Sequence, residues 1–122
     1  MAWTDYSSAP AAGTDLCAAA QVQGVLSLKI ETERGVFPLL VLRAGGEFRA
    51  YVNACPHQYL PLDYRGGGLL SADGARLMCS AHGAQFDIKT GEAKAGPVQG
   101  PDCALDAVPL REEGGRLQIG GA

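Results

Sequence analysis

Long apolar runs, basic clusters and histidines are all scarce in this chain. No segment approaches the roughly 18 apolar residues that a membrane-spanning helix needs. The N-terminus, MAWTDYSSAP, has no basic region, no twin arginine and no apolar stretch before a small-residue cleavage site, so we expect a cytoplasmic protein with no membrane partner. No run of Lys or Arg occurs and the net charge is −3, so we expect no nucleic-acid partner either.

The composition favours one β-rich domain. The chain has 122 residues, which is the size of a single ordinary domain. Its charged fraction is only 19% and its hydrophobic fraction is 47%, which excludes a disordered chain. With 17 glycines and 7 prolines, short elements and turns are favoured over long helices. The expected fold class is therefore all-β.

Three consecutive strands are predicted in the first half of the chain. From Leu26 onward, apolar and polar residues alternate strictly, which is typical of a half-buried strand. A continuous apolar run follows at Val36–Leu42, and Gly45-Gly46 joins it to a second alternating segment at Glu47–Ala54. These segments predict a meander. In the last of them Phe48, Ala50 and Val52 alternate with Arg49, Tyr51 and Asn53.

Further short strands are predicted downstream. Asp73-Gly74 is a hairpin signal between Leu69-Leu70 and Arg76–Met78. The segment Gln85–Lys89 alternates again before a turn at Thr90-Gly91. The last hairpin is predicted around Glu113-Gly114-Gly115. Its two strands are Leu105–Arg111 and Arg116–Ile119.

The N-terminal region lacks a strand pattern. Residues 1–13 are rich in Ala, Ser, Gly and Pro without periodicity, and we expect an arm that lies on the surface or is partly disordered. Thr14 and Asp15 are expected to cap a short helical turn over Cys17–Ala20.

Both histidines of the chain lie close to a cysteine. One motif is Cys55-Pro56-His57 and the other is Cys79-Ser80-Ala81-His82. A reducing cytosol keeps thiols free, so metal binding is a better use for these cysteines than a disulfide framework. Two thiolates and two imidazoles suit either a structural zinc ion held by all four or a [2Fe-2S] cluster with both cysteines on one iron and both histidines on the other.

The spacing favours the cluster over zinc. Zinc fingers usually pair Cys with Cys and His with His, with about 12 residues between the pairs. Here each loop supplies one Cys and one His, and residues 58–78 separate the loops. Two similar loops can then hold a binuclear cluster from opposite sides, each giving its Cys to one iron and its His to the other.

These motifs resemble the Rieske iron-sulfur proteins. The match rests on C-P-H at 55–57, C-S-A-H-G at 79–83, A-Q-F-D at 84–87 and G-P at 96–97, and the resemblance extends over about Phe37–Ile119. It implies an antiparallel β-sandwich, residues 14–122 here, with an inserted cluster-binding subdomain at about 54–101. The interval between His57 and Cys79 is longer than in small ferredoxins of the family, so Tyr64–Arg76 is expected to protrude as a hairpin.

The resemblance also implies a low reduction potential. High-potential members have a disulfide between the two loops, and Leu60 and Ala81 occupy those positions here. They also have Ser and Tyr hydroxyls that donate hydrogen bonds to sulfur, where this chain has Ala84 and Phe86. Fewer hydrogen bonds to sulfur lower the potential, so we expect about −150 mV, the lower end of the Rieske range.

The resemblance implies a soluble one-electron carrier rather than an enzyme. The expected partners are a flavin-dependent reductase and a terminal oxygenase. Both histidines are already used as ligands, which leaves none for the mononuclear iron of an oxygenase. Two alternatives remain: a small electron-transfer subunit bound to the large subunit of a nitrite-reductase-type complex, and a structural zinc module. Cys17 and Cys103 are expected to be ordinary small residues and not ligands.

Overall fold

The computed structural model of the chain contains two compact units. The first is made of Met1–Val52 together with Asp106–Ala122, and the second is made of Asn53–Leu105. The second unit is therefore an insertion in the sequence of the first. The described part of the chain consists of residues 3–22, 24–44, 47–54, 70, 76–78, 85–95 and 104–120.

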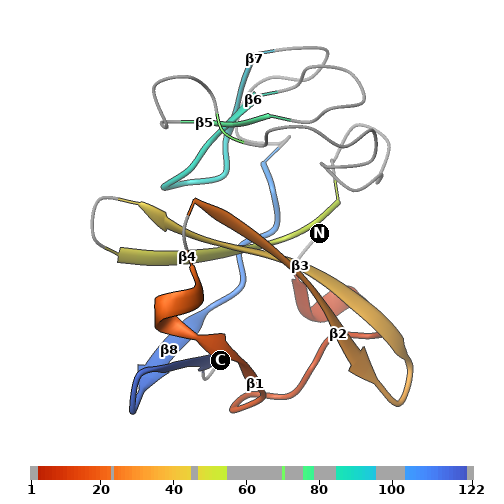
Figure 1. Ribbon diagram of the computed structural model, residues 1–122. Helices are drawn as coiled ribbons and strands as arrows, with labels where there is room; N and C mark the ends of the chain where they lie inside the picture. Colours follow the sequence, from red (N-terminus) through yellow and green to blue (C-terminus); the bar gives the residue numbers. More distant parts are fainter. Residues whose placement is uncertain are drawn as a thin grey trace. The chain divides into compact units, whose positions relative to one another are not determined.

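The predicted meander forms one sheet of the first unit (Figure 1). Its strands are β2 (Val25–Thr32), β3 (Gly35–Ala44) and β4 (Glu47–Val52), all antiparallel, with β3 in the middle. The second half of β2 alternates between exposed and half-buried side chains, as expected for a strand with one solvent face. The prediction of three consecutive paired strands is confirmed.

Strand β3 is buried on both faces. Phe37 and every residue of Leu39–Leu42 are 0% exposed, whereas Val36 at the start of the same apolar run is 51% exposed. Successive side chains of a strand point to opposite faces, so a run of four buried residues requires cover on both sides of the sheet. This explains why β3 is a continuous apolar run rather than an alternating one.

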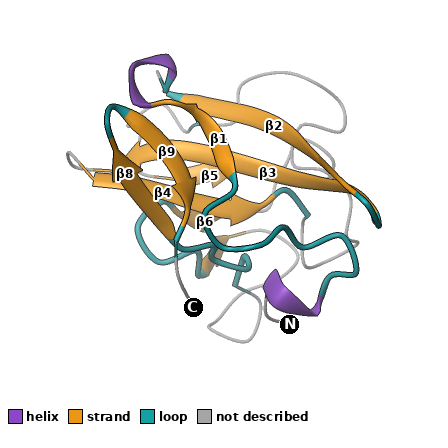
Figure 2. Ribbon diagram, turned by 90° about the horizontal axis from the view of Figure 1, so that it is seen from below, coloured by secondary structure: helices purple, strands orange, loops and turns teal. Residues whose placement is uncertain are grey.

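A second sheet forms the other layer of the first unit. It contains β1 (Asp15–Ala18), β9 (Arg116–Ile119) and β8 (Leu110–Glu113), in that order. Figures 1 and 2 show this sheet and the β2–β3–β4 sheet as two separate layers. The antiparallel sandwich expected for the fold is therefore present.

The predicted last hairpin joins β8 to β9. Glu113 pairs with Arg116, so the connection consists of Gly114 and Gly115. Their φ angles are +59° and +78°, a left-handed conformation that side chains other than glycine rarely adopt. A two-residue loop with positive φ at both positions is the turn that matches the twist of paired strands.

The helical turn predicted over Cys17–Ala20 is largely wrong. Residues 15–18 form β1, and only Ala19–Gln21 forms a short 3-10 helix. The reason is pairing with a distant strand: β1 is antiparallel to β9, and Cys17 pairs with Leu117. The Asp15 carboxylate accepts two hydrogen bonds from the Arg116 guanidinium, each 2.8 Å long, and this hydrogen-bonding lowers the pKa of Asp15 below its ordinary value.

The strand predicted over Leu105–Arg111 starts later than expected. Strand β8 begins at Leu110, and the segment before it makes only one isolated antiparallel bridge, between Ala107 and Tyr51. The Val108 amide donates to the Ala50 carbonyl at 2.9 Å. Pro109 follows at once, and because proline has no amide hydrogen it interrupts the ladder.

The N-terminal arm packs on the first unit. The rings of Trp3 and Tyr6 both meet the ring of buried Phe37 edge-on, with centroid distances of 6.3 and 5.9 Å. The Tyr6 hydroxyl donates to the Asp106 carboxylate at 3.0 Å, and the Gly13 amide donates to the Ile119 carbonyl at 2.8 Å. These contacts fix residues 3–13 against the sandwich.

Helix is almost absent from the described residues. It consists of two single 3-10 turns, Trp3–Asp5 and Ala19–Gln21. Within the described ranges, no helix has the length and apolar character needed to cross a bilayer. The all-β prediction from glycine and proline content is confirmed.

The second unit contains its own antiparallel sheet. Its strands are β5 (Arg76–Met78), β6 (Gln85–Asp87) and β7 (Ala93–Ala95), with β6 in the middle. Leu77 and Phe86 pair across β5 and β6 and are both 0% exposed. Leu77 and Phe86 therefore form a buried pair on one face of this short sheet.

The turn after β6 is held by Asp87. Its carboxylate accepts hydrogen bonds from the amides of Lys89 and Thr90 at 2.7 and 3.2 Å, and Gly91 adopts a φ of +79°. The predicted turn at Thr90-Gly91 is confirmed. Before β5, Leu70 makes an isolated antiparallel bridge to Leu77, while Asp73-Gly74 and most of the predicted Tyr64–Arg76 hairpin lie outside the described residues.

Burial of β3 predicts a sharp contrast between two positions of one apolar run. Leu40→Ala should lower the free energy of unfolding by about 2–5 kcal/mol, because it leaves a cavity in the core. Val36→Ala should change it by less than about 0.5 kcal/mol, because Val36 is largely exposed. Urea unfolding followed by circular dichroism measures both. Equal losses in the two variants would contradict the burial of β3.

Candidate metal centre

Strands β5 and β6 bracket the second Cys/His motif. Met78 and Gln85 are the last residue pair of the two strands, so the sequence between them, residues 79–84, is the connection of a hairpin. The Arg76 guanidinium donates to the side-chain oxygen of Gln85 at 3.2 Å, which adds a side-chain contact across the same two strands. Cys79 and His82 belong to this connection and lie outside the described residues.

The first Cys/His motif follows the end of β4. Val52 is the last residue of β4, and its amide donates to the Asp106 carbonyl at 2.9 Å. Asn53 is next and is 4% exposed. Cys55 and His57 follow it and lie outside the described residues. The described backbone therefore fixes the point from which this motif starts.

The alternation of polar and apolar residues in and after β4 did not predict which side chains are buried at its end. Tyr51 and Asn53 alternate with apolar residues, yet Tyr51 is 1% exposed and Asn53 is 4% exposed. The last residues of β4 are thus buried on both faces. Asn53 is a polar residue of the site region that the sequence pattern did not single out, although it is the one asparagine in the chain and stands two residues before a predicted ligand.

The chemistry of the donor set fits a mixed-ligand iron-sulfur cluster. All four predicted ligands fall between Asn53 and Leu105, the bounds of the second unit. One motif starts from the end of a paired strand and the other joins two paired strands, so each would present one thiolate and one imidazole from a fixed strand end. Two thiolates on one iron and two imidazoles on the other is the Rieske ligand set.

Cys17 lies in the first unit, whereas both Cys/His motifs fall within the bounds of the second. It is a free cysteine in β1, 4% exposed, and burial raises the pKa of its thiol above the ordinary value. Burial thus disfavours the charged thiolate form of this side chain. Among the described residues no group of three or more His, Cys, Asp or Glu side chains is placed to hold a metal ion. Cys103 lies outside them.

Phe86 occupies a buried position in the second unit. It lies in the central strand β6 and is 0% exposed. The phenyl side chain has no hydroxyl, so it cannot donate a hydrogen bond to a sulfur atom. The other positions used to predict a low potential lie outside the described residues: Leu60, Ala81 and Ala84. The Gly96-Pro97 part of the family motif lies outside them too.

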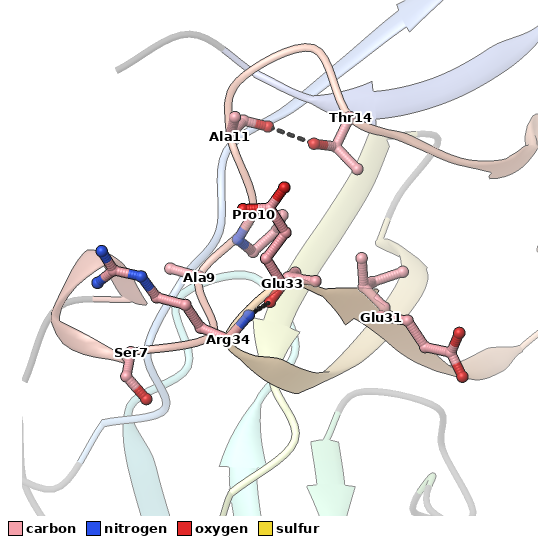
Figure 3. Close-up of a pocket in the computed structure, with 10 residues that line it drawn as sticks. Ser7, Ala9, Pro10, Ala11, Thr14, Glu31, Glu33 and Arg34 are labelled. Atoms are coloured by element: carbon pink, nitrogen blue, oxygen red, sulfur yellow. Dashed lines mark hydrogen bonds between the residues drawn. The ribbon is translucent and has the colours of Figure 1, made fainter.

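An open depression in the first unit has lining residues of other types than the Cys/His motifs. It measures about 380 Å³ and lies between the N-terminal arm and the turn that joins β2 to β3 (Figure 3). Its described lining residues include Ser7, Pro10, Glu31 and Arg34 but neither Cys nor His. It therefore offers no thiolate or imidazole to a metal centre.

Comparison with known proteins supports the interpretation of the motifs. Residues 14–111 match the family described as Rieske [2Fe-2S] domain. The ferredoxin component of the alkene monooxygenase system of Xanthobacter autotrophicus is 36% identical over 86 residues, which are 70% of this chain and 64% of that protein. The ferredoxin component of the p-cumate 2,3-dioxygenase system of Pseudomonas putida is 34% identical over 104 residues, which are 85% of this chain and 81% of that protein.

Solved structures agree with these relatives. The ferredoxin of Sphingomonas yanoikuyae B1 matches with a TM-score of 0.68 and 30% identity, over 90% of this chain and 99% of that one. A chain from a complex of reduced oxygenase and oxidized ferredoxin in carbazole 1,9a-dioxygenase matches with a TM-score of 0.66 and 27% identity, over 88% of this chain and 91% of that one. The β-sandwich, the inserted unit and the two Cys/His motifs agree with these relatives. The chain belongs to the Rieske [2Fe-2S] domain family.

Proposed function

We propose that Cys55, His57, Cys79 and His82 hold the [2Fe-2S] cluster, with both cysteines on one iron and both histidines on the other. The proposal is supported by the donor set, by the placement of each motif at the end of a paired strand, and by membership of the Rieske family. When bound, the cluster accepts and releases one electron. The four side chains hold it, and the histidines form the edge through which the electron enters and leaves.

The chain then acts as the ferredoxin component of an oxygenase system. It accepts electrons from a flavin-dependent reductase and delivers them to a terminal oxygenase, and it works in the cytoplasm. The observation that carries this function is the use of histidine: the chain has two, and both lie in the ligand motifs. A mononuclear non-haem iron needs two further histidines and a carboxylate, so the oxygenase chemistry belongs to a partner.

The potential of this carrier lies at the low end of the Rieske range. Hydrogen bonds to cluster and cysteine sulfur stabilise the reduced, more negative state. Phe86 is buried and has no donor group, and Ala84 has none either. We therefore expect a reduction potential of about −150 mV, which suits transfer from a flavin to an oxygenase.

Ligand substitutions test the assignment of the four residues. His57→Ala and His82→Ala should each lose the cluster, because each removes one of the two protein ligands of one iron. Cys17→Ser should keep it, because Cys17 lies in β1 of the other unit. Iron content and visible absorption of the purified variants measure this. A colourless Cys17→Ser protein that folds would contradict the assignment.

Reconstitution tests the carrier role. With NADH and a flavin-dependent ferredoxin reductase of an aromatic-ring dioxygenase system, the visible absorption of the chain should bleach. On addition of the oxygenase component, the ring-hydroxylated product should form only when the chain is present. Cys17→Ser serves as the matched positive control and His82→Ala as the negative one. A chain that purifies only in a stable complex with a large reductase subunit would contradict a free carrier.

Phe86→Tyr tests the origin of the low potential. The added hydroxyl can donate a hydrogen bond at the position where high-potential relatives have one, so the reduction potential should rise. Phe48→Tyr, a half-buried phenylalanine of β4 in the first unit, should leave the potential unchanged. Protein-film voltammetry measures both. An unchanged or lower potential in Phe86→Tyr would contradict this explanation.

A further inference from the structure

Asn53 is the buried polar residue of the described part of the chain. The other buried residues of the core are hydrophobic in type, although Tyr51 carries a hydroxyl and Cys17 a thiol. Asn53 is 4% exposed and directly follows Tyr51 and Val52, which are 1% and 0% exposed. Burying a carboxamide in such surroundings is unfavourable unless its polar atoms are hydrogen-bonded. Packing alone therefore does not explain an asparagine at this position.

Asn53 has interaction partners in the structure. A side-chain amide offers two N–H donors and one carbonyl oxygen with two lone pairs. No fully buried side-chain nitrogen or oxygen in the described residues lacks a hydrogen-bond partner, and Asn53 itself makes at least one interaction. A buried carboxamide whose polar atoms have partners is restricted in its position, because moving it would break those interactions.

Asn53 stands where the strand ladder ends and the first ligand motif begins. The last ladder residue is Val52, which pairs with Leu39 in β3 and whose amide donates to Asp106. Beyond Val52, β4 has no further residue pair. The next anchoring group along the chain is the buried side chain of Asn53, two residues before Cys55.

We propose that Asn53 is a positioning residue of the metal centre, because its buried carboxamide fixes the chain between the end of β4 and Cys55. This inference rests on the ligand role proposed for Cys55 and His57. Asn53 does not touch iron in this role. It determines how firmly the first motif holds its thiolate and imidazole, and therefore how slowly the cluster is released.

Two substitutions distinguish the hydrogen bonding of the Asn53 side chain from its size and shape. Asn53→Leu keeps a similar size and removes all hydrogen bonds of the side chain. Asn53→Asp keeps the shape and an acceptor oxygen but replaces the two N–H donors. Loss of buried hydrogen bonds should make iron release in excess chelator about tenfold faster in Asn53→Leu. The EPR g values of the reduced protein should shift or broaden as well. Asn53→Asp should change both quantities in the same direction, because it also loses the two N–H donors.

Two control variants distinguish positioning from general loss of stability. Gln118→Leu removes a half-buried amide of β9 that accepts a hydrogen bond from Arg111 at 2.9 Å. Val41→Ala removes buried volume from β3. Both should lower the unfolding midpoint, yet the folded protein should keep the wild-type EPR signal. Asn53→Leu should change that signal even at temperatures where it is fully folded.

Different results would overturn the positioning role of Asn53 and the ligand role of Cys55. A wild-type release rate and EPR signal in Asn53→Leu would overturn the positioning role while leaving the ligands in place. A Cys55→Ser protein that keeps the wild-type EPR signal would instead overturn the ligand role of that motif. If Asn53→Leu fails to fold, Asn53→Asp decides, and an unchanged release rate and signal in that variant would also overturn the positioning role.

Discussion

The hydrogen bond from the Val52 amide to the Asp106 carbonyl is the contact on which the rest of the structure depends. The chain leaves the sandwich after Val52 and returns at Asp106, and these residues are joined at 2.9 Å. The Tyr51–Ala107 bridge extends the pairing. Because the entropic cost of closing a loop grows only slowly with its length, an insertion as long as residues 53–105 is tolerated once its ends are paired. The same pairing sets the starting point of the first ligand motif.

Local patterns predicted the elements that fold against their neighbours in sequence. The alternation from Leu26 and the apolar run Val36–Leu42 gave the meander, and Gly114-Gly115 gave the last hairpin, because each pairs with the next strand. Strand β1 was missed because its partner β9 lies at the other end of the chain. No local pattern indicates that Asp15 will meet Arg116, so capping chemistry misleadingly favoured a helix there.

The prediction of the site rested on the types of the candidate ligand residues more than on the pattern of strands. Thiolate and imidazole are the groups that bind iron in this way, so the two mixed motifs indicated a cluster before any strand was placed, and family membership agrees. The part played by Asn53 could not be predicted in this manner. Asn53 is 4% exposed, whereas the alternation of residues 47–54 alone would assign it to a polar face.

Ligation of iron by two thiolates and two imidazoles is the central claim, and an EPR spectrum of the dithionite-reduced protein tests it most directly. Iron and zinc should be determined on the same sample. Mixed ligation predicts a rhombic signal whose average g lies below the free-electron value, with about two irons per chain. About one zinc per chain and no signal would contradict both the cluster and the electron-transfer function.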